Sequence, residues 1–168
     1  MNQQVSDIQK RVVDKQPAKK YLTFLLNEKT YAVSILNVKE ILEYGTVTAI
    51  PKMPDFVYGA INLRGKVVPV VDLRQCLEQK ECEINKRSCI VIIEVAHDNS
   101  SRNIGVIVDS VSKVMDFEAE DIERAPTLGE NINTEFIDGM GKIGDQFVIM
   151  LNISKILSLE DISKLTAV

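Results

Sequence analysis

The 168-residue sequence has no tryptophan, one histidine and three cysteines, and aromatic residues make up only 5% of it. Cys76, Cys82 and Cys89 are odd in number and lack the close C-x-x-C spacing of zinc and redox motifs. We therefore expect buried or idle thiols and no metal site. A core with so few aromatic side chains is left to Val, Ile and Leu, which favours β-structure.

Long apolar runs are also missing. No stretch approaches the ~18 apolar residues of a membrane span, and residues 1–4 do not begin the apolar segment of a signal peptide. These absences predict a cytoplasmic protein. The chain is long enough to bury about two-thirds of its unfolded surface, in one compact domain or two small, tightly joined ones.

The sequence offers no catalytic group. His97 is the only histidine, and its neighbours Asp98 and Asn99 predict a polar turn rather than a pocket. Neither a second histidine nor a serine in a strained glycine elbow is present to act as base or nucleophile. Gly65 with Lys66 is not a phosphate loop, because a valine follows where Ser or Thr would bind magnesium. We expect neither an enzyme nor a cofactor.

The charge distribution argues against nucleic acid as a partner. The net charge is -4, and residues 1–20 hold five Lys/Arg against two Asp, a local +3 that leaves -7 for the remainder. Residues 115–135 hold seven Asp/Glu and one Arg, a face that repels phosphate backbones. The acidic run 118–123 lacks the glycine and ligand alternation of a calcium-binding EF-hand loop, so we expect a solvated face.

Residues 1–19 are polar and charged with little periodicity, which predicts a disordered tail, with a short helix over Val5–Val13 as the alternative. Tyr21–Leu26 and Thr30–Ser34 then predict a hairpin. The apolar spacing from Ile35 to Leu42 predicts a short helical turn. Polar residues 78–88 suggest a joint between two halves.

The second half is also rich in predicted strands. The pattern predicts strands over Cys89–Val95, Ile104–Val114 and Phe147–Leu151, followed by short helices over Ile153–Leu157 and Ile162–Leu165.

Residues 59–73 are the most informative segment. Ala60–Leu63 and Val67–Val71 read as two strands joined by a polar turn around Gly65, and Pro69 should lie at a sheet edge or a bulge. Residues 137–157 repeat the order of glycine turn, apolar strand and short helix, which indicates a faint internal repeat.

This hairpin resembles the signature hairpin of the CheW family, the coupling proteins of bacterial chemotaxis. The resemblance runs from Tyr21 to Leu157 and includes residues 31–41, 104–111 and 147–151. It implies a mainly β fold with short helices, made of two small SH3-like five-stranded β-barrels side by side. Residues 20–83 would form the first barrel and residues 84–168 the second, with the first strand able to cross between them.

The resemblance implies a non-enzymatic adaptor. It would couple the cytoplasmic tips of chemoreceptors, the methyl-accepting chemotaxis proteins, to the histidine kinase CheA, whose regulatory domain has the same fold. Such a protein is cytoplasmic and is recruited to membrane-associated receptor arrays.

Three segments match those that form the family's receptor-binding groove between the barrels. The matching residues are Val38, Glu40, Arg64, Gly105, Val111 and Val114. The valines would form an apolar floor for a receptor helix, with Glu40 and Arg64 as polar anchors. The valines are equally compatible with the core, Gly105 with a backbone requirement, and Arg64 with an internal ion pair to Glu40. No residue is indicated for kinase binding.

Two other interpretations stay open at the level of sequence. One is an oligonucleotide-binding β-barrel, which the scarcity of aromatic residues and the acidic surface disfavour. The other is a CheW-like domain cut from a larger fused relative. We expect a stand-alone protein instead, because the chain ends at Val168, just after the last predicted helix. The sequence names neither the receptor and its signal nor the kinase paralogue.

Overall fold

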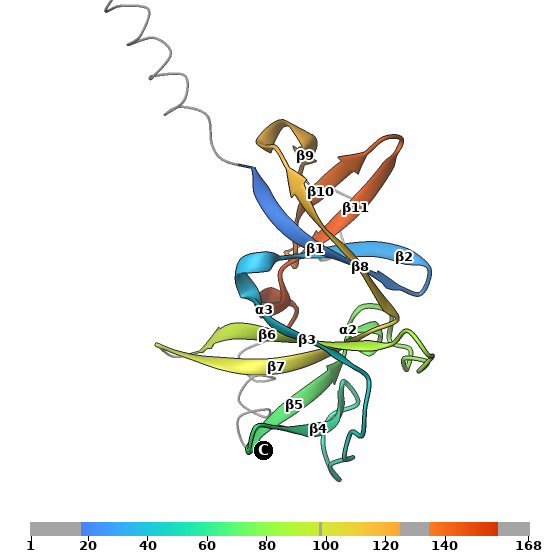
Figure 1. Ribbon diagram of the computed structural model, residues 1–168, viewed down its shortest axis with the longest axis vertical. Helices are drawn as coiled ribbons and strands as arrows, with labels where there is room; N and C mark the ends of the chain where they lie inside the picture. Colours follow the sequence, from blue (N-terminus) through green and yellow to red (C-terminus); the bar gives the residue numbers. More distant parts are fainter. Residues whose placement is uncertain (1–17, 98, 125–134, 158–168) are drawn as a thin grey trace, which may run out of the picture.

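The computed structural model describes residues 18–97, 99–124 and 135–157, and most of these residues lie in two β-sheets (Figure 1). One sheet has the strand order β8-β1-β2-β11-β10-β9. Its strands are β1 (Lys19–Leu26), β2 (Lys29–Ser34), β8 (Ser110–Phe117), β9 (Ile122–Glu123), β10 (Ile137–Ile143) and β11 (Gln146–Leu151).

The other sheet has the order β3-β6-β7-β5-β4. Its strands are β3 (Val38–Glu43), β4 (Val57–Leu63), β5 (Lys66–Asp72), β6 (Cys89–His97) and β7 (Ser100–Val108). The helices are short: η1 (Ile35–Asn37), α2 (Leu73–Glu78), η2 (Ala119–Asp121) and α3 (Ile153–Ile156). The predicted fold class, mainly β with short helices, is confirmed, although one sheet has six strands rather than five.

The two sheets follow the same plan. In each, the second strand of one hairpin pairs in parallel with the second strand of another, β2 with β11 and β7 with β5. A short helix then follows β11 and β5, capped by Asn152 and Asp72, whose side chains accept the backbone N–H groups of Lys155 and Gln75. The internal repeat predicted from residues 59–77 and 137–157 is therefore present in the structure.

The repeated units exchange their first hairpins. Along the chain one unit runs from β1 to α2 and the other from β6 to α3. Yet β1 and β2 pair with β8 and β11 of the second unit, and β6 and β7 pair with β3 and β5 of the first. Each sheet thus contains strands from both halves of the sequence, and more than the first strand crosses between the halves.

Two sequence predictions missed the places where the chain changes sheets. The helical turn expected from Ile35 to Leu42 is only η1, and β3 begins at Val38. The single strand expected over Ile104–Val114 is split at Asp109 into β7 and β8. Asp109 donates its N–H to the carbonyl of Leu25 at 3.0 Å, and its carboxylate accepts the N–H of Asn27 at 2.8 Å. These bonds hold the crossing point against the β1–β2 turn.

Both sheets curl so that a chain leaving one edge strand reaches the opposite edge. After β8 the chain passes through η2 into β9, which pairs with β10. After β3 it reaches β4, where Thr48 and Ala60 exchange two backbone hydrogen bonds of 2.9 Å. This bridge also explains Pro69, which lies on the inner strand β5 rather than at an edge, opposite the residue that follows the register shift between Val57 and Gly59 of β4. Its partner Ala60 is bonded to Thr48, and pairing of β5 with β7 begins only at Val70, so neither ladder needs an N–H from Pro69.

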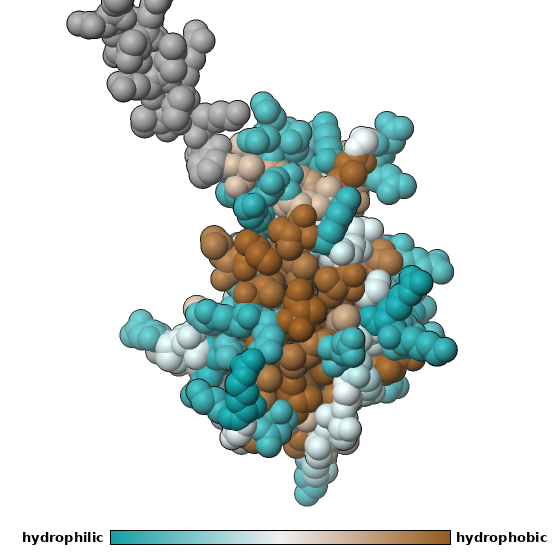
Figure 2. All heavy atoms as spheres, viewed as in Figure 1, coloured by the Kyte–Doolittle hydropathy of each residue, from teal (hydrophilic) through white to brown (hydrophobic). Residues whose placement is uncertain are grey.

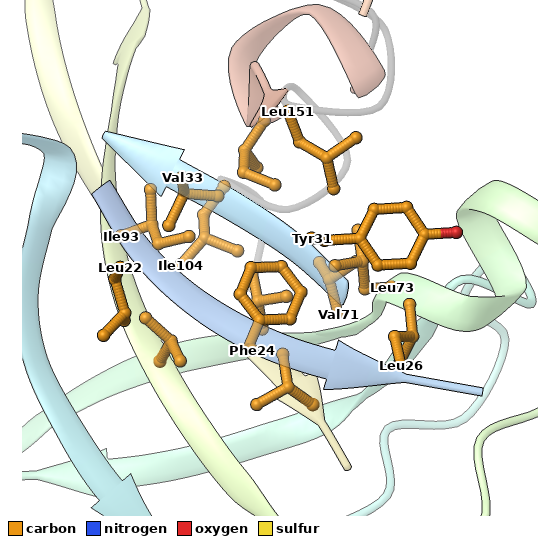
Figure 3. Packing of buried hydrophobic residues seen from close by; sticks show 14 of the residues in the cluster. Leu22, Phe24, Leu26, Tyr31, Val33, Val71, Leu73, Ile93, Ile104 and Leu151 are labelled. Carbon is orange, nitrogen blue, oxygen red and sulfur yellow. The ribbon is translucent and has the colours of Figure 1, made fainter. Parts of the chain in front are cut away.

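The largest core lies between the two sheets (Figure 3). Leu22, Phe24 and Val33 enter it from one sheet, and Ile93 and Ile104 from the other. Because side chains alternate along a strand, β6 sends Val91, Ile93 and Val95 to this intersheet core. It sends Ile90 and Ile92 to a second core inside the five-stranded sheet. A third core, around Phe117 and Met150, fills the six-stranded sheet. The shared central core fixes the two sheets relative to one another.

Several predictions are only partly covered by the described residues. The predicted tail overlaps the structure at Lys19, which already belongs to β1, while the helices expected over Val5–Val13 and Ile162–Leu165 lie outside the described residues. The backbone of His97 ends β6 instead of lying in a turn. Cys82 is buried in the core of the five-stranded sheet, as a structural thiol would be.

Candidate partner-binding surface

Two edge strands, β3 and β8, border the intersheet core. Val38 of β3 and Val111 of β8 are half-buried and pack against that core. Ile41 is paired with Val91, and Val114 with Leu22, and both partners belong to the same core. Since paired residues on neighbouring strands point to the same face, all four aliphatic side chains line the edge of the intersheet core. We call Val38, Ile41, Val111 and Val114 the β3–β8 surface.

Much of this apolar surface is open to solvent. Val114 is 49% exposed and Ile41 is 43% exposed. Figure 2 shows hydrophobic side chains gathered across the middle of the face on which Figure 1 places β8 and β3. Contiguous exposed apolar side chains on a folded protein mark binding surfaces more often than random exposure does.

A β-bulge in each edge strand produces this arrangement. The register shifts between Val38 and Glu40 on β3. On β8 the chain advances three positions from Val111 to Val114, while the paired strand β1 advances two, between Phe24 and Leu22. In β8 the extra residue is held by Thr23, whose hydroxyl donates to the carbonyl of Lys113 at 2.7 Å and accepts its N–H at 3.2 Å. A bulge brings residues three apart to one face of a strand. This explains both the misleading helical spacing after Ile35 and the recurrence of apolar residues three positions apart.

The bulged residue of β3, Lys39, is directed to a carboxylate on the neighbouring strand. Its Nζ lies 2.7 Å from Oε2 of Glu94, and this hydrogen bond, together with the positive charge, holds the pKa of Glu94 below its usual value. The lysine charge is thereby compensated locally.

Glu40 and Arg64 meet, but on the other side of β3. Arg64 Nη2 lies 2.8 Å from Glu40 Oε1. Glu40 is paired with Ile92, whose side chain belongs to the core of the five-stranded sheet, so it points away from the face that carries Val38. Arg64 lies in the β4–β5 turn with φ of 51°, followed by Gly65 with φ of 84°. The internal ion pair considered from the sequence is therefore formed.

The pair leaves Arg64 accessible. Its side chain is 74% exposed while that of Glu40 is 28% exposed. A guanidinium has five N–H donors, and the contact with Glu40 uses one nitrogen, so further donors face solvent beside β3. An internal pair and a contact with a partner are compatible at this position.

Gly105 lies inside the five-stranded sheet rather than on the β3–β8 surface. It is buried between Ile92 of β6 and Val70 of β5. A Cβ added there would lie 2.8 Å from Cγ2 of Ile90 and 3.3 Å from Cγ2 of Val70. The structure thus supports the backbone requirement that the sequence left open for Gly105.

Sequence reasoning missed Ile41, although the signal was present. Val38 and Ile41 repeat the spacing of Val111 and Val114, and both pairs lie on bulged edge strands. Recognising the two segments as equivalent positions of the repeat would have added Ile41 to the candidate residues.

The described residues offer little for other kinds of site. Within them, no three His, Cys, Asp or Glu side chains are grouped so that they could hold a metal ion. No helix in the described part of the chain is long and apolar enough to cross a membrane. Burial and the nearby Asp72 raise the pKa of Cys82 to about 12, so that thiol is not a nucleophile at neutral pH.

Comparison with known proteins gives a consistent result. The family model described as CheW-like domain matches residues 20–161. The chain is 35% identical to chemotaxis protein CheW of Klebsiella aerogenes over 85% of this chain and 84% of that protein. It is 31% identical to chemotaxis protein CheW of Bacillus subtilis over 84% and 88%. The crystal structure of scaffolding protein TtCheW from Thermoanaerobacter tengcongensis superposes with a TM-score of 0.74 at 32% identity, covering 87% of this chain and 91% of that one.

Proposed function

The chain belongs to the CheW-like family of chemotaxis coupling proteins, and from this premise we propose that it binds chemoreceptor tips and the histidine kinase CheA at the same time. As a member of this family it is a scaffold and adaptor in chemotaxis signalling and not an enzyme. The proposal places it at the cytoplasmic ends of the receptors, in the receptor arrays.

The β3–β8 surface is the receptor-binding site in this proposal. The observation that carries it is the set of aliphatic side chains, Val38, Ile41, Val111 and Val114, left partly open at the edge of the intersheet core. An α-helix binds such a surface through apolar residues at positions i, i+3, i+4 and i+7. The receptor tip would supply that helix.

In our proposal Arg64 supplies a polar anchor across β3 from this surface, on the side that faces away from Val38, and Glu40 holds its guanidinium in place. An arginine that is already oriented by an ion pair loses less side-chain entropy when a partner binds. In our proposal Gly105 contributes indirectly, because its lack of a side chain lets β7 pack between β5 and β6.

The shared core explains how such an adaptor transmits a signal. The two sheets pack through one central cluster, so a partner bound to both is held in a defined geometry. An adaptor of this kind makes and breaks no bond. It biases the kinase between its states through differential contacts with the receptor.

Co-sedimentation tests the proposal. The purified protein is mixed with a chemoreceptor tip fragment and CheA encoded by the same genome, and the ternary complex is pelleted. Val114→Asp places a charge on the β3–β8 surface and should abolish receptor binding, whereas Val67→Asp, on the exposed turn side of β5, should not. Equal receptor binding by both variants would exclude the β3–β8 surface, and failure of the unmodified protein to bind would exclude the receptor as partner.

A further inference from the structure

Leu36 is the most exposed of the large apolar side chains that the structure describes. It lies in η1 and is 87% exposed. Ser34 caps this turn, and its Oγ accepts the N–H of Leu36 at 3.4 Å. The turn is thus held by the backbone and by Ile35, which packs against the intersheet core, while Leu36 belongs to none of the three described cores.

A mostly apolar hollow of about 560 Å³ lies beside Leu36. The start of β1, the turn η1 and Asp138 of β10 form its walls. Its charged lining residues are Lys19, Lys20 and Asp138, and the Nζ of Lys20 also lies 3.5 Å from Oδ1 of Asp116, so these charges balance locally. The hollow can therefore accept an apolar side chain.

The hollow continues the β3–β8 surface. Leu22 and Val114 form one cross-strand pair on the face that looks toward the other sheet, and the next pair on that face is Lys20 with Asp116. The hollow thus begins one pair of residues beyond Val114. Leu36 of η1 and Ile41 of β3 are five residues apart in the sequence, a span of at most about 17 Å.

We infer that the helix bound by the β3–β8 surface extends across η1 and packs an apolar side chain against Leu36. This rests on the proposed receptor site and lengthens it. At 1.5 Å per residue, a span of at most about 17 Å corresponds to no more than roughly eleven residues, or three helical turns. The partner is thus an amphipathic helix whose apolar stripe reaches from Ile41 to Leu36 within three turns.

The binding energy of Leu36 can be separated from its effect on folding. Titration calorimetry with the purified receptor tip fragment compares the unmodified protein with Leu36→Ser, Leu36→Met and Val114→Ser. Leu36→Ser should weaken binding about 5- to 30-fold, while the apolar Leu36→Met stays close to the unmodified protein. Val67→Ser is the matched control, because Val67 is also strongly exposed but lies on β5.

The outcomes separate failure of the receptor-binding proposal from failure of the extension across η1. If the unmodified protein does not bind the tip fragment, the receptor proposal fails and this inference fails with it. If the protein binds, and Val114→Ser weakens binding while Leu36→Ser stays within twofold, only the extension across η1 is wrong. A clear fall in melting temperature for Leu36→Ser would also overturn it, because it would mean that Leu36 packs against the protein itself.

Discussion

Replacing Arg64 by alanine separates the two roles available to its side chain. In the folded protein the change removes the contact of 2.8 Å between Arg64 and Glu40. Because the arginine is 74% exposed, the pair is screened by water and contributes about 0.2–1 kcal/mol to the free energy of unfolding. For a chain of this size such a loss lowers the melting temperature by no more than about 4 °C.

The expected effect on receptor binding is larger. Loss of a charge-assisted hydrogen bond at an interface costs about 1–3 kcal/mol of binding free energy, which corresponds to a roughly 5- to 150-fold larger dissociation constant. The kinase affinity should not change if kinase and receptor use different surfaces. We thus expect Arg64→Ala to be nearly neutral for stability and strongly harmful for receptor binding.

The assay combines scanning calorimetry with titration of the receptor tip fragment for Arg64→Ala, Glu40→Ala and the double variant. Lys66→Ala is the control, because Lys66 is exposed at the start of β5, next to the same turn, but has no ion pair among the described contacts. If the internal pair is the main role of Arg64, both single changes lower the melting temperature and the double change is less than additive. Unchanged receptor affinity of Arg64→Ala would refute the anchor.

Three further predictions concern stability. Gly105→Ala should lower the free energy of unfolding by about 1–3 kcal/mol, seen as a lower urea midpoint, because its Cβ would crowd Ile90. Cys82 should resist alkylation until the protein unfolds. Its folded pKa is about 12 and its unfolded pKa is 9.0, so the thiol's contribution to stability is complete below pH 9 and is lost as the pH rises toward 12. Cys82→Ala should remove this dependence of the free energy of unfolding on pH. Glu78→Ala removes the acceptor that Asn27 reaches from the β1–β2 turn at 2.9 Å, and should speed amide hydrogen exchange in that turn; unchanged exchange would mean that the turn is held by other contacts.

Local turn chemistry made parts of the fold predictable. The β1–β2 turn contains Asn27 and Glu28 with positive φ, and the β4–β5 turn contains Gly65, so both hairpins could be recognised from short segments. The exchange of hairpins could not, because the parallel pairing of β2 with β11 joins residues more than a hundred positions apart. No local pattern distinguishes a hairpin that completes its own unit from one that completes the other.

The candidate site was likewise only partly predictable from local sequence. Val38, Val111 and Val114 came from the resemblance to known coupling proteins, and the register then showed which face they occupy. Ile41 was hidden because its spacing from Val38 looked helical, and only the bulge brings it to the same face. The exposure of Leu36 depends on how η1 lies against β1, which no sequence pattern determines.

The two edge strands of the site begin where the chain changes sheets. β3 follows η1 directly, and β8 follows Asp109 directly. After each crossing between the sheets, the chain therefore forms a strand at the edge of the intersheet core. One strand belongs to the first repeated unit and the other to the second. A helix lying on the β3–β8 surface must therefore contact both sheets, and its binding free energy depends on their relative position. Because the central core fixes that position, a shift of the bound helix acts on the adaptor as a whole rather than on one sheet.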